Sequence, residues 1–434
     1  MKKFLATLLA LVMVLSLVAC GGGGDDTKTP DSSTPSTGDT STPSTGDTTT
    51  PDANPAADVK VGVILIGDEN EGYSYAHIAG IRGAQQNLGL SDDQIIWYYT
   101  IPEDETAYDK CVDLADQGCD VIFTNSYGHQ SFAQQAAAEY PDVTFVAMTG
   151  DTALASGLPN FKNAFTEIYE ARYVSGVVAG MKVKELVEAG SLKDSNFDAN
   201  GNVKLGYVGA FPFAEVVSGY TAFYLGAKSV YDKVVMDVRF TNSWFDVTGE
   251  SEAAKALMAG GCVIIGQHAD STGSPTAVQA AYEAGDTVFC VGYNIDMLAA
   301  APDAALTSPT NDWSVYYTYA IETIINGGEI MTNWAEGYDQ GAVAITALGP
   351  QAAAGTAEAV AAAEAALSDG SLHVFETSKF TVGGQEVTSF LARDTDGDWV
   401  NDTDEAVFDG YLHESYFQAA PCFSLEIDGI TKLN

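Results

Sequence analysis

The apolar run VKVGVILIG at residues 59–67 decides the fold class, because it has the length of a buried β-strand and precedes a segment of helical length at 74–88. Further apolar runs lie at 94–100, 120–125 and 143–150, separated by helical-length segments at 106–117 and 130–139. Nearly continuous apolar strands that alternate with helices are typical of a parallel sheet covered on both faces. The pattern therefore predicts an α/β fold.

A second series of the same kind follows the first along the chain. Its strand-like runs lie at 203–211, 234–242, 262–267 and 287–294, and its helices are expected near 215–230, 250–259 and 274–284. Two such series predict two doubly wound parallel-sheet domains joined by a hinge. The expected organisation is an N-terminal lobe at 58–165 completed by part of 287–345, a C-terminal lobe at 166–286 completed by part of 310–375, and a C-terminal segment at 376–434.

Candidate ligand-binding residues lie in the loops that follow the predicted strands. In doubly wound sheets, ligands bind where these loops gather at the carboxyl ends of the strands. Here the loops combine aromatic side chains with hydrogen-bond acceptors, which suits a flat heteroaromatic ligand that carries N–H groups. Any single aromatic residue among them could instead pack in the core of a domain. The candidates are Tyr73, Asn125, Ser126, Tyr127, Phe211, Trp244, His268, Asp270, Asn294 and Asp296.

One of these loops, GQHADSTG at 266–273, contains a base, an acid and two hydroxyl groups. A hydrolase that uses His268, Asp270 and Ser271 is one hypothesis, but consecutive residues of one loop rarely place a nucleophile, a base and an orienting group correctly. The sequence also lacks a GxSxG motif and a phosphate-binding glycine loop. We therefore expect that the protein is not an enzyme and that this loop binds a ligand. Ser271 and Thr272 are expected to cap the helix that follows.

The first twenty residues, MKKFLATLLALVMVLSLVAC, have two lysines before an apolar stretch that is too short to span a bilayer, as in a secretory signal. Their end, LVAC, resembles the bacterial lipobox, which implies lipid on Cys20 and an extracytoplasmic protein anchored to a cell membrane of the Gram-positive type. A secreted protein without lipid is the alternative. Residues 21–57 are rich in Gly, Ser, Thr and Pro and repeat STPSTGDT in tandem, which predicts a disordered tether.

The charge and the cysteines exclude several classes of function. The chain has 59 acidic residues against 19 Lys and Arg, a formal charge of −40, which disfavours nucleic acid as a partner and keeps an exposed protein soluble. After Cys20, five scattered cysteines remain, and three of them lie at or inside strand-like runs. We expect buried thiols rather than a disulfide framework or a zinc site.

Several longer segments carry a resemblance to a known family. These segments are AAAEYPDVTF (136–145), YEARYVSGVVAG (169–180), GYVGAFPFAEVVSGYTAFYLGAKSV (206–230), NSWFDVTGESEAAKAL (242–257) and ALTSP (305–309). In this order they resemble the basic membrane protein family, the purine-nucleoside-receptor-like substrate-binding lipoproteins of ABC transporters. The resemblance covers nearly the whole chain from about residue 59. It implies a type I periplasmic-binding-protein fold, a purine ligand, ABC permease subunits as partners and no required cofactor.

The sequence departs from the nucleoside-binding pattern of this family. The resemblance aligns an Asp and a Phe-Asn pair of that pattern to Asn70, Tyr73 and Ser74, a later Asp to Asn294, and a Lys to Asn311. The carboxylates that would accept both hydroxyls of a ribose are therefore depleted. These departures favour the branch that binds a free base such as adenine, and a purine nucleoside such as adenosine, guanosine or inosine is the alternative.

Roles for the candidate residues follow from a purine ligand. Tyr73 and Phe211 are expected to sandwich the ring, while Trp244 closes one side. Asp270 and Asp296 are expected to accept hydrogen bonds from an exocyclic amine or a ring N–H. The rest of the polar edge is expected to come from Asn125, Ser126 and Tyr127. The protein is expected to act as a monomer.

The stretch DTDGDWVNDTDE at 394–405 has the oxygen spacing of an EF-hand calcium loop. The expected Ca²⁺ ligands are Asp394, Asp396, Asp398, the carbonyl of Val400, Asp402 and Glu405. Trp399 stands where an EF-hand has Gly, so a solvated acidic hairpin is the alternative. A bound ion would order the loop far from the ligand cleft. A calcium-dependent surface adhesin is a further hypothesis, which would not require the aromatic strand-end loops.

Overall fold

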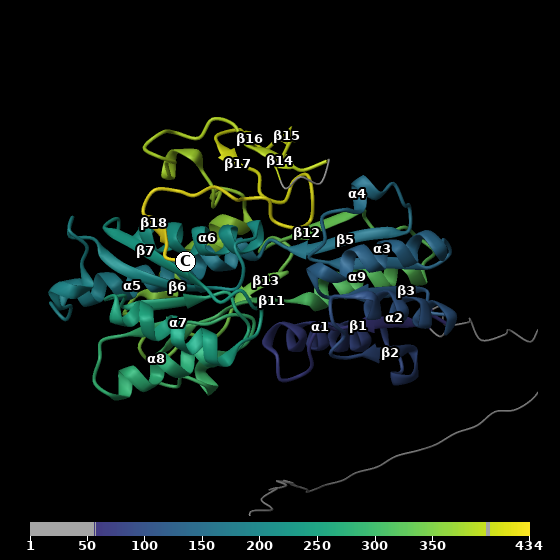
Figure 1. Ribbon diagram of the computed structural model, residues 1–434, viewed down its shortest axis with the longest axis horizontal. Coiled ribbons are helices and arrows are strands. Elements are labelled where there is room, and N and C mark those ends of the chain that lie inside the picture. Colours follow the sequence, from purple (N-terminus) through teal and green to yellow (C-terminus); the bar gives the residue numbers. More distant parts are fainter. Residues whose placement is uncertain (1–55, 57, 396–399) are drawn as a thin grey trace, which may run out of the picture. The chain divides into compact units, whose positions relative to one another are not determined.

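Two six-stranded sheets organise the protein, and each is the core of one lobe (Figure 1). The computed structural model describes residue 56 and residues 58–395 and 400–434. In spatial order, the first sheet consists of β12 (Asn333–Glu336), β5 (Phe161–Thr166), β4 (Thr144–Met148), β3 (Val121–Thr124), β1 (Val61–Ile64) and β2 (Ile95–Tyr98). The second consists of β10 (Ala305–Thr307), β9 (Phe289–Val291), β8 (Ile264–Gln267), β6 (Val203–Gly209), β7 (Val234–Phe240) and β18 (Ile430–Lys432). Neighbouring strands in both sheets are parallel, which confirms the predicted α/β class.

Helices cover both faces of the first sheet. Helices α1 (Gly72–Leu88) and α9 (Trp313–Ile325) pack on each other and on one face, and α2 (Glu105–Asp116) and α3 (Gln130–Glu139) cover the other. The short helix α4 (Ala153–Ser156) follows β4. Strand β1 is buried at all four positions. Its continuous apolar sequence therefore follows from its central place between two helical layers.

The second sheet is covered in the same way. Helices α5 (Ile168–Glu188) and α6 (Ala214–Val230) lie on one face with α10 (Thr356–Ser368) packed on α5, and α7 (Val247–Ala259) and α8 (Gly273–Glu283) cover the other. Helices α5 and α6 can approach closely because Gly226 faces the backbone of α5. A Cβ atom at Gly226 would lie 2.0 Å from the carbonyl oxygen of Tyr173.

The chain passes between the lobes where β5 leads into α5, again between β10 and α9, and again after β12. Next to these crossings, β11 (Pro309–Asn311) and β13 (Val343–Ile345) form an antiparallel pair. Residues 287–345 thus divide between the lobes. Strands β9 and β10 extend the second sheet, whereas α9 and β12 complete the first.

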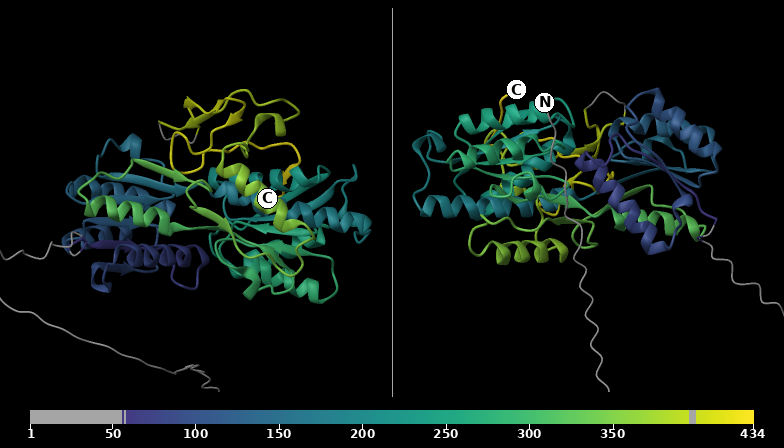
Figure 2. Two further views of the ribbon diagram at one scale, coloured as in Figure 1. Left: turned by 180° about the vertical axis from the view of Figure 1, so that it is seen from behind. Right: turned by 90° about the horizontal axis from the view of Figure 1, so that it is seen from below.

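The C-terminal segment forms two short hairpins and then returns to the second lobe (yellow in Figures 1 and 2). The hairpins are β14 (Leu391–Arg393) with β15 (Thr403–Glu405) and β16 (Val407–Phe408) with β17 (Tyr411–Leu412). Strand β18 then pairs with β7 at the edge of the second sheet. Short 3₁₀ helices are η2 (Asp92–Gln94), η3 (Tyr127–His129), η4 (Asp194–Asn196), η5 (Met297–Ala299) and η6 (Thr377–Lys379).

Within the described residues, no helix is both long enough and apolar enough to cross a membrane. The lipidation site predicted at Cys20 lies outside the described residues, as does the predicted tether apart from Ala56. The five cysteines after Cys20 are buried free thiols, as expected.

Candidate functional site

A cavity of about 790 Å³ lies at the carboxyl ends of the strands, where the sequence predicts a ligand site. Loops from both lobes line it: those after β1, β3 and β4 in the first lobe and those after β6, β7, β8 and β9 in the second. Seven of the ten predicted site residues line this cavity. They are Tyr73, Asn125, Ser126, Tyr127, Trp244, His268 and Asp270.

Phe211 does not line the cavity, contrary to its predicted place against the ligand ring, and Phe213 lies there in its stead. Phe211 stacks behind Phe213 with ring centroids 5.2 Å apart and meets Trp244 edge-on at 5.1 Å. It therefore supports the two aromatic rings that face the cavity. Phe213 is also 6.0 Å from the ring of Tyr127, which belongs to the other lobe, so this aromatic pair bridges the cleft.

Asp296 is also outside the cavity lining, because a local hydrogen bond holds its side chain. Its carboxylate accepts from the backbone N–H of Leu298 at 2.8 Å and caps the 3₁₀ helix η5. Asp at such a position satisfies a free backbone donor rather than a ligand. For α8, only one of the two predicted capping residues makes such a bond. Thr272 precedes α8 without a side-chain capping bond, whereas the Ser271 hydroxyl accepts from the N–H of Gly273.

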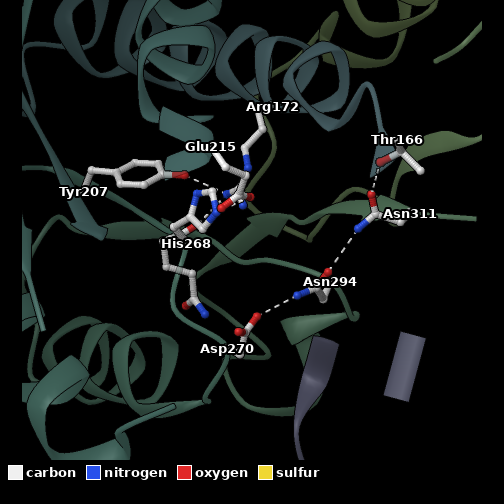
Figure 3. Close-up of polar contacts among 9 residues, drawn as sticks. Thr166, Arg172, Tyr207, Glu215, His268, Asp270, Asn294 and Asn311 are labelled. Atoms are coloured by element: carbon white, nitrogen blue, oxygen red, sulfur yellow. Dashed lines mark hydrogen bonds and ion pairs between the residues drawn. The ribbon is translucent and has the colours of Figure 1, made fainter. Parts of the chain in front are cut away.

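Asn294, the third candidate outside the lining, supports Asp270 from behind (Figure 3). Its amide Nδ2 donates to Asp270 Oδ1 at 2.7 Å, and its Oδ1 accepts from Asn311 Nδ2 at 3.2 Å. Asn311 in turn accepts from the hydroxyl of Thr166 at the end of β5. This polar chain connects the cavity to two of the crossings between the lobes. Asn294 has a left-handed backbone with φ of 61°, which Asn tolerates better than most residues.

His268 lies in a second buried cluster on the opposite side of Asp270's loop (Figure 3). Burial lowers the pKa of His268, so the neutral imidazole donates Nε2–H to Glu215 at 2.6 Å. Nearby, buried Arg172 donates to the Tyr207 hydroxyl at 2.7 Å and to the Gln267 carbonyl at 2.6 Å. These contacts fix the strand-end loop. They do not pair His268 with the Ser271 hydroxyl, as the hydrolase hypothesis would require.

Tyr293 connects this cluster to the cavity, although it was not among the predicted site residues. It lines the cavity, and the guanidinium carbon of Arg172 lies 3.6 Å from the centre of its ring. The cation therefore stacks behind the aromatic wall instead of facing the ligand directly.

The polar candidates of the first lobe mostly brace their own loops. The Tyr73 hydroxyl donates to the Asn125 carbonyl at 2.6 Å, and the Asn125 side chain accepts from the N–H of Ile66 at 2.8 Å. Ser126 donates to Glu103 at 2.6 Å and Tyr127 donates to Asp151 at 3.1 Å. Their side chains therefore shape the wall of the cavity.

The cavity wall is acidic. Its lining contains no lysine or arginine among the described residues, and it contains the carboxyl groups of Asp68, Glu71, Asp151, Glu215, Asp270 and Asp394. Burial raises the pKa of Glu71 and of Asp151. Asp270 is 7% exposed, and burial, followed by the charges of Glu71 and Glu250, raises its pKa well above its ordinary range. The wall thus holds carboxyl groups that favour the protonated form.

The C-terminal segment contributes lining residues that the sequence analysis missed. They are Ala392, Asp394, Asn401, Gln418, Ala420, Pro421, Cys422 and Ser424. No motif marks these residues as a site, since only the fold brings them to the cleft.

The expectation that the acidic loop at 394–405 lies far from the cleft is wrong, because Asp394 and Asn401 line the cavity. Asp396 and Asp398 lie outside the described residues. Of the other proposed calcium ligands, Asp402 accepts from the Thr395 hydroxyl and Glu405 from the N–H groups of Phe390 and Val407. Among the described residues, no three acidic, His or Cys side chains are arranged to hold a metal. Calcium binding stays a prediction.

Comparison with known proteins places the chain in a family. Residues 59–365 match the model of the Bmp family, the PnrA-like substrate-binding proteins of ABC transporters. The chain belongs to this family. It is 33% identical to a purine-binding protein of Brucella abortus over 276 aligned residues. The alignment covers 63% of this chain and 71% of the Brucella protein. It is 32% identical over 335 aligned residues to a Haloferax volcanii protein that is named for glucose binding in an ABC transporter. This alignment covers 74% of this chain and 76% of the Haloferax protein.

Solved structures of low sequence identity show the same fold. A solute-binding protein of an ABC transporter from Conexibacter woesei matches with a TM-score of 0.55 at 22% identity and covers 73% of this chain and 98% of its own. A solute-binding protein from Aeropyrum pernix matches with a TM-score of 0.59 at 14% identity, and the match covers 73% of this chain and 93% of the Aeropyrum chain. This Bmp-family chain therefore has the type I periplasmic-binding-protein fold. As a member of this substrate-binding family, it is an extracytoplasmic solute-binding protein and not an enzyme.

Proposed function

We propose that this Bmp-family protein captures a purine for an ABC importer and that it favours a free base such as adenine. The observation that carries the proposal is the composition of the cavity wall. It combines aromatic rings with six carboxyl groups and has no lysine or arginine among the described lining residues. Such a wall suits a flat ligand with N–H donors, and it offers no lysine or arginine among the described lining residues to pair with a phosphate, which disfavours nucleotides.

The position and protonation of Asp270 support a ring-edge contact. Asn294 donates to Oδ1 of Asp270, so Oδ2 can be directed to a ligand. Burial raises the pKa of Asp270, which favours a protonated carboxyl that offers an O–H donor as well as an acceptor. A purine edge with an amine next to a ring nitrogen offers the complementary pair. Aromatic side chains can hold the ring faces, with Tyr73, Phe213 and Trp244 the first candidates.

A free base is favoured over a nucleoside because Asn294 and Asn311, which stand where the nucleoside-binding pattern has an Asp and a Lys, are used within the protein. Asn294 and Asn311 bind each other, and their remaining partners are Asp270 and Thr166. The relative at 33% identity, which is named for purine binding, also supports a purine. The relative at 32% identity supports a hexose as a second candidate, because carboxyl groups and aromatic rings also suit sugar hydroxyls.

The remaining parts of the proposal concern where the protein acts. A lipid anchor at Cys20 and a tether over the residues that follow it belong to the same proposal, and from there a monomer would deliver its ligand to permease subunits. Calcium at 394–405 would be a structural addition. A melting temperature that rises in calcium relative to chelator supports it, and equal melting temperatures count against it.

The proposal is tested by thermal-shift titration of the mature chain with adenine, guanine, hypoxanthine, adenosine, guanosine, inosine and glucose. Adenine is expected to raise the melting temperature most, because a ligand that binds only the folded state stabilises it. A response to nucleosides alone would overturn the free-base claim. A response to glucose alone would overturn the purine claim.

A further inference from the structure

The C-terminal segment places a second wall of the cavity outside the region that matches the family. Residues 414–424, which we call the strap, lie beyond the matched residues 59–365. Five strap residues line the cavity: Gln418, Ala420, Pro421, Cys422 and Ser424. In Figures 1 and 2 the yellow C-terminal chain runs beside both lobes.

The strap is fixed at one end to the first lobe and at the other to the second. Ala419 is fully buried in the core cluster of the first lobe, and its N–H donates to Asn333 at the start of β12. Phe423 is fully buried in the core cluster of the second lobe and stacks on Phe375 with ring centroids 4.4 Å apart. Only three residues lie between these two anchors along the chain, so four Cα-to-Cα steps join them.

A hydrogen bond inside the strap holds its shape. The buried carboxyl group of Glu414 accepts from the N–H of Phe423 at 2.9 Å and from the Cys422 thiol at 3.8 Å. Four Cα-to-Cα steps span at most about 14 Å, so the strap keeps the two anchors close. The protein's own contacts hold this wall, so little order has to be created when a ligand binds.

The chemistry of the strap differs from that of the rest of the wall. Ala420, Pro421 and Cys422 are buried, small and uncharged, and burial raises the pKa of the Cys422 thiol well above its usual value. Gln418 is half-buried beside them. A ligand in the acidic cleft would meet here a neutral surface whose polar side chains are the Gln418 amide and the Ser424 hydroxyl. Any larger side chain at Ala420 would take volume from the ligand.

We propose that the strap is a ligand-contacting wall that limits ligand size, with Ala420 as the residue that sets the limit and Gln418 as its polar contact. The proposal deepens the proposed function and rests on it, because it concerns the same cleft.

The test is calorimetric titration of the mature wild-type chain and its variants with adenine, adenosine and glucose. Ala420→Phe is expected to weaken adenosine at least tenfold and adenine by less, because the larger ligand leaves less free volume. The matched control is Ala353→Phe, since Ala353 is 7% exposed against 6% for Ala420 and lies outside the cavity lining. The control is expected to change each affinity by less than twofold.

A second variant covers the case in which Ala420→Phe fails to fold. Gln418→Ala, at a half-buried position, is expected to weaken the tightest of the three ligands about three- to tenfold. Affinities within twofold of wild type in every folded strap variant would overturn the strap proposal. Wild-type binding of glucose but neither purine would overturn the proposed function alone, and the strap would then be judged with glucose. Binding of none of the three would overturn both.

Discussion

Asn294→Gly tests whether the polar chain behind Asp270 positions the ligand site. The substitution removes two hydrogen bonds, the 2.7 Å bond to Asp270 and the 3.2 Å bond from Asn311. Glycine is chosen because the φ of 61° at this position strains most other residues, whereas glycine adopts it freely. The effect is therefore that of the lost amide and not of a strained backbone.

The size of the effect follows from the bonds that are lost. Each hydrogen bond contributes about 1 kcal/mol net, so the free energy of unfolding is expected to fall by about 2 kcal/mol. An Asp270 carboxyl that is no longer held would lose part of its own bond to the ligand. At about 1.4 kcal/mol per tenfold, adenine affinity is expected to fall roughly tenfold.

The assay is isothermal titration with adenine, combined with a denaturant melt. Asn242→Gly serves as the control, because Asn242 is also left-handed, with φ of 56°, and lies outside the cavity lining. The control is expected to keep wild-type affinity. If Asn294→Gly binds adenine as tightly as Asn242→Gly does, the positioning role of Asn294 is refuted.

Three further outcomes are expected. Glu250→Gln is expected to raise stability by on the order of 3 kcal/mol at pH 8 and to leave it unchanged near pH 4, as followed by thermal melts, because burial raises the pKa of Glu250 from 4.5 to about 7. Ionisation in the folded state is thus costly, and the wild-type chain loses this stability as the pH rises from about 4.5 to about 7. Trp244→Ala, which opens the aromatic wall, is expected to weaken adenine roughly tenfold in titrations, and unchanged affinity would remove Trp244 from the site. Adenosine monophosphate is expected not to bind in the same titrations, because no described lysine or arginine of the lining can pair with its phosphate, and micromolar binding would contradict this reasoning.

The sheets and the position of the site could be predicted because both depend on local patterns. Strand β1 lies inside the apolar run at 59–67, and the loops after the predicted strands meet at the cavity. Which side chains of these loops face the cavity could not be predicted in the same way. Phe211 and Phe213 are two residues apart in one loop, and only the folded backbone decides which ring faces the cavity. The Asp296 side chain caps the 3₁₀ helix η5 instead of facing the cavity, and the residue type alone does not tell a capping Asp from a ligand-binding one.

The contribution of the C-terminal segment was out of reach for the sequence analysis for a different reason. Strand β18 has the short sequence ITK, is half-exposed or exposed throughout, and exists only because β7 offers an edge. Ala420 and Cys422 carry no functional signal, since small buried residues occur throughout a core. Their role depends on contacts with both lobes that lie far away in sequence.

The most direct test of the central claim is a calorimetric titration of adenine into the wild-type mature chain and into Asp270→Ala. We expect one adenine bound per wild-type chain, and we expect Asp270→Ala to bind adenine at least a hundredfold more weakly while still melting cooperatively. Equal affinity in the two proteins, or no adenine binding by the wild-type chain, would contradict this claim.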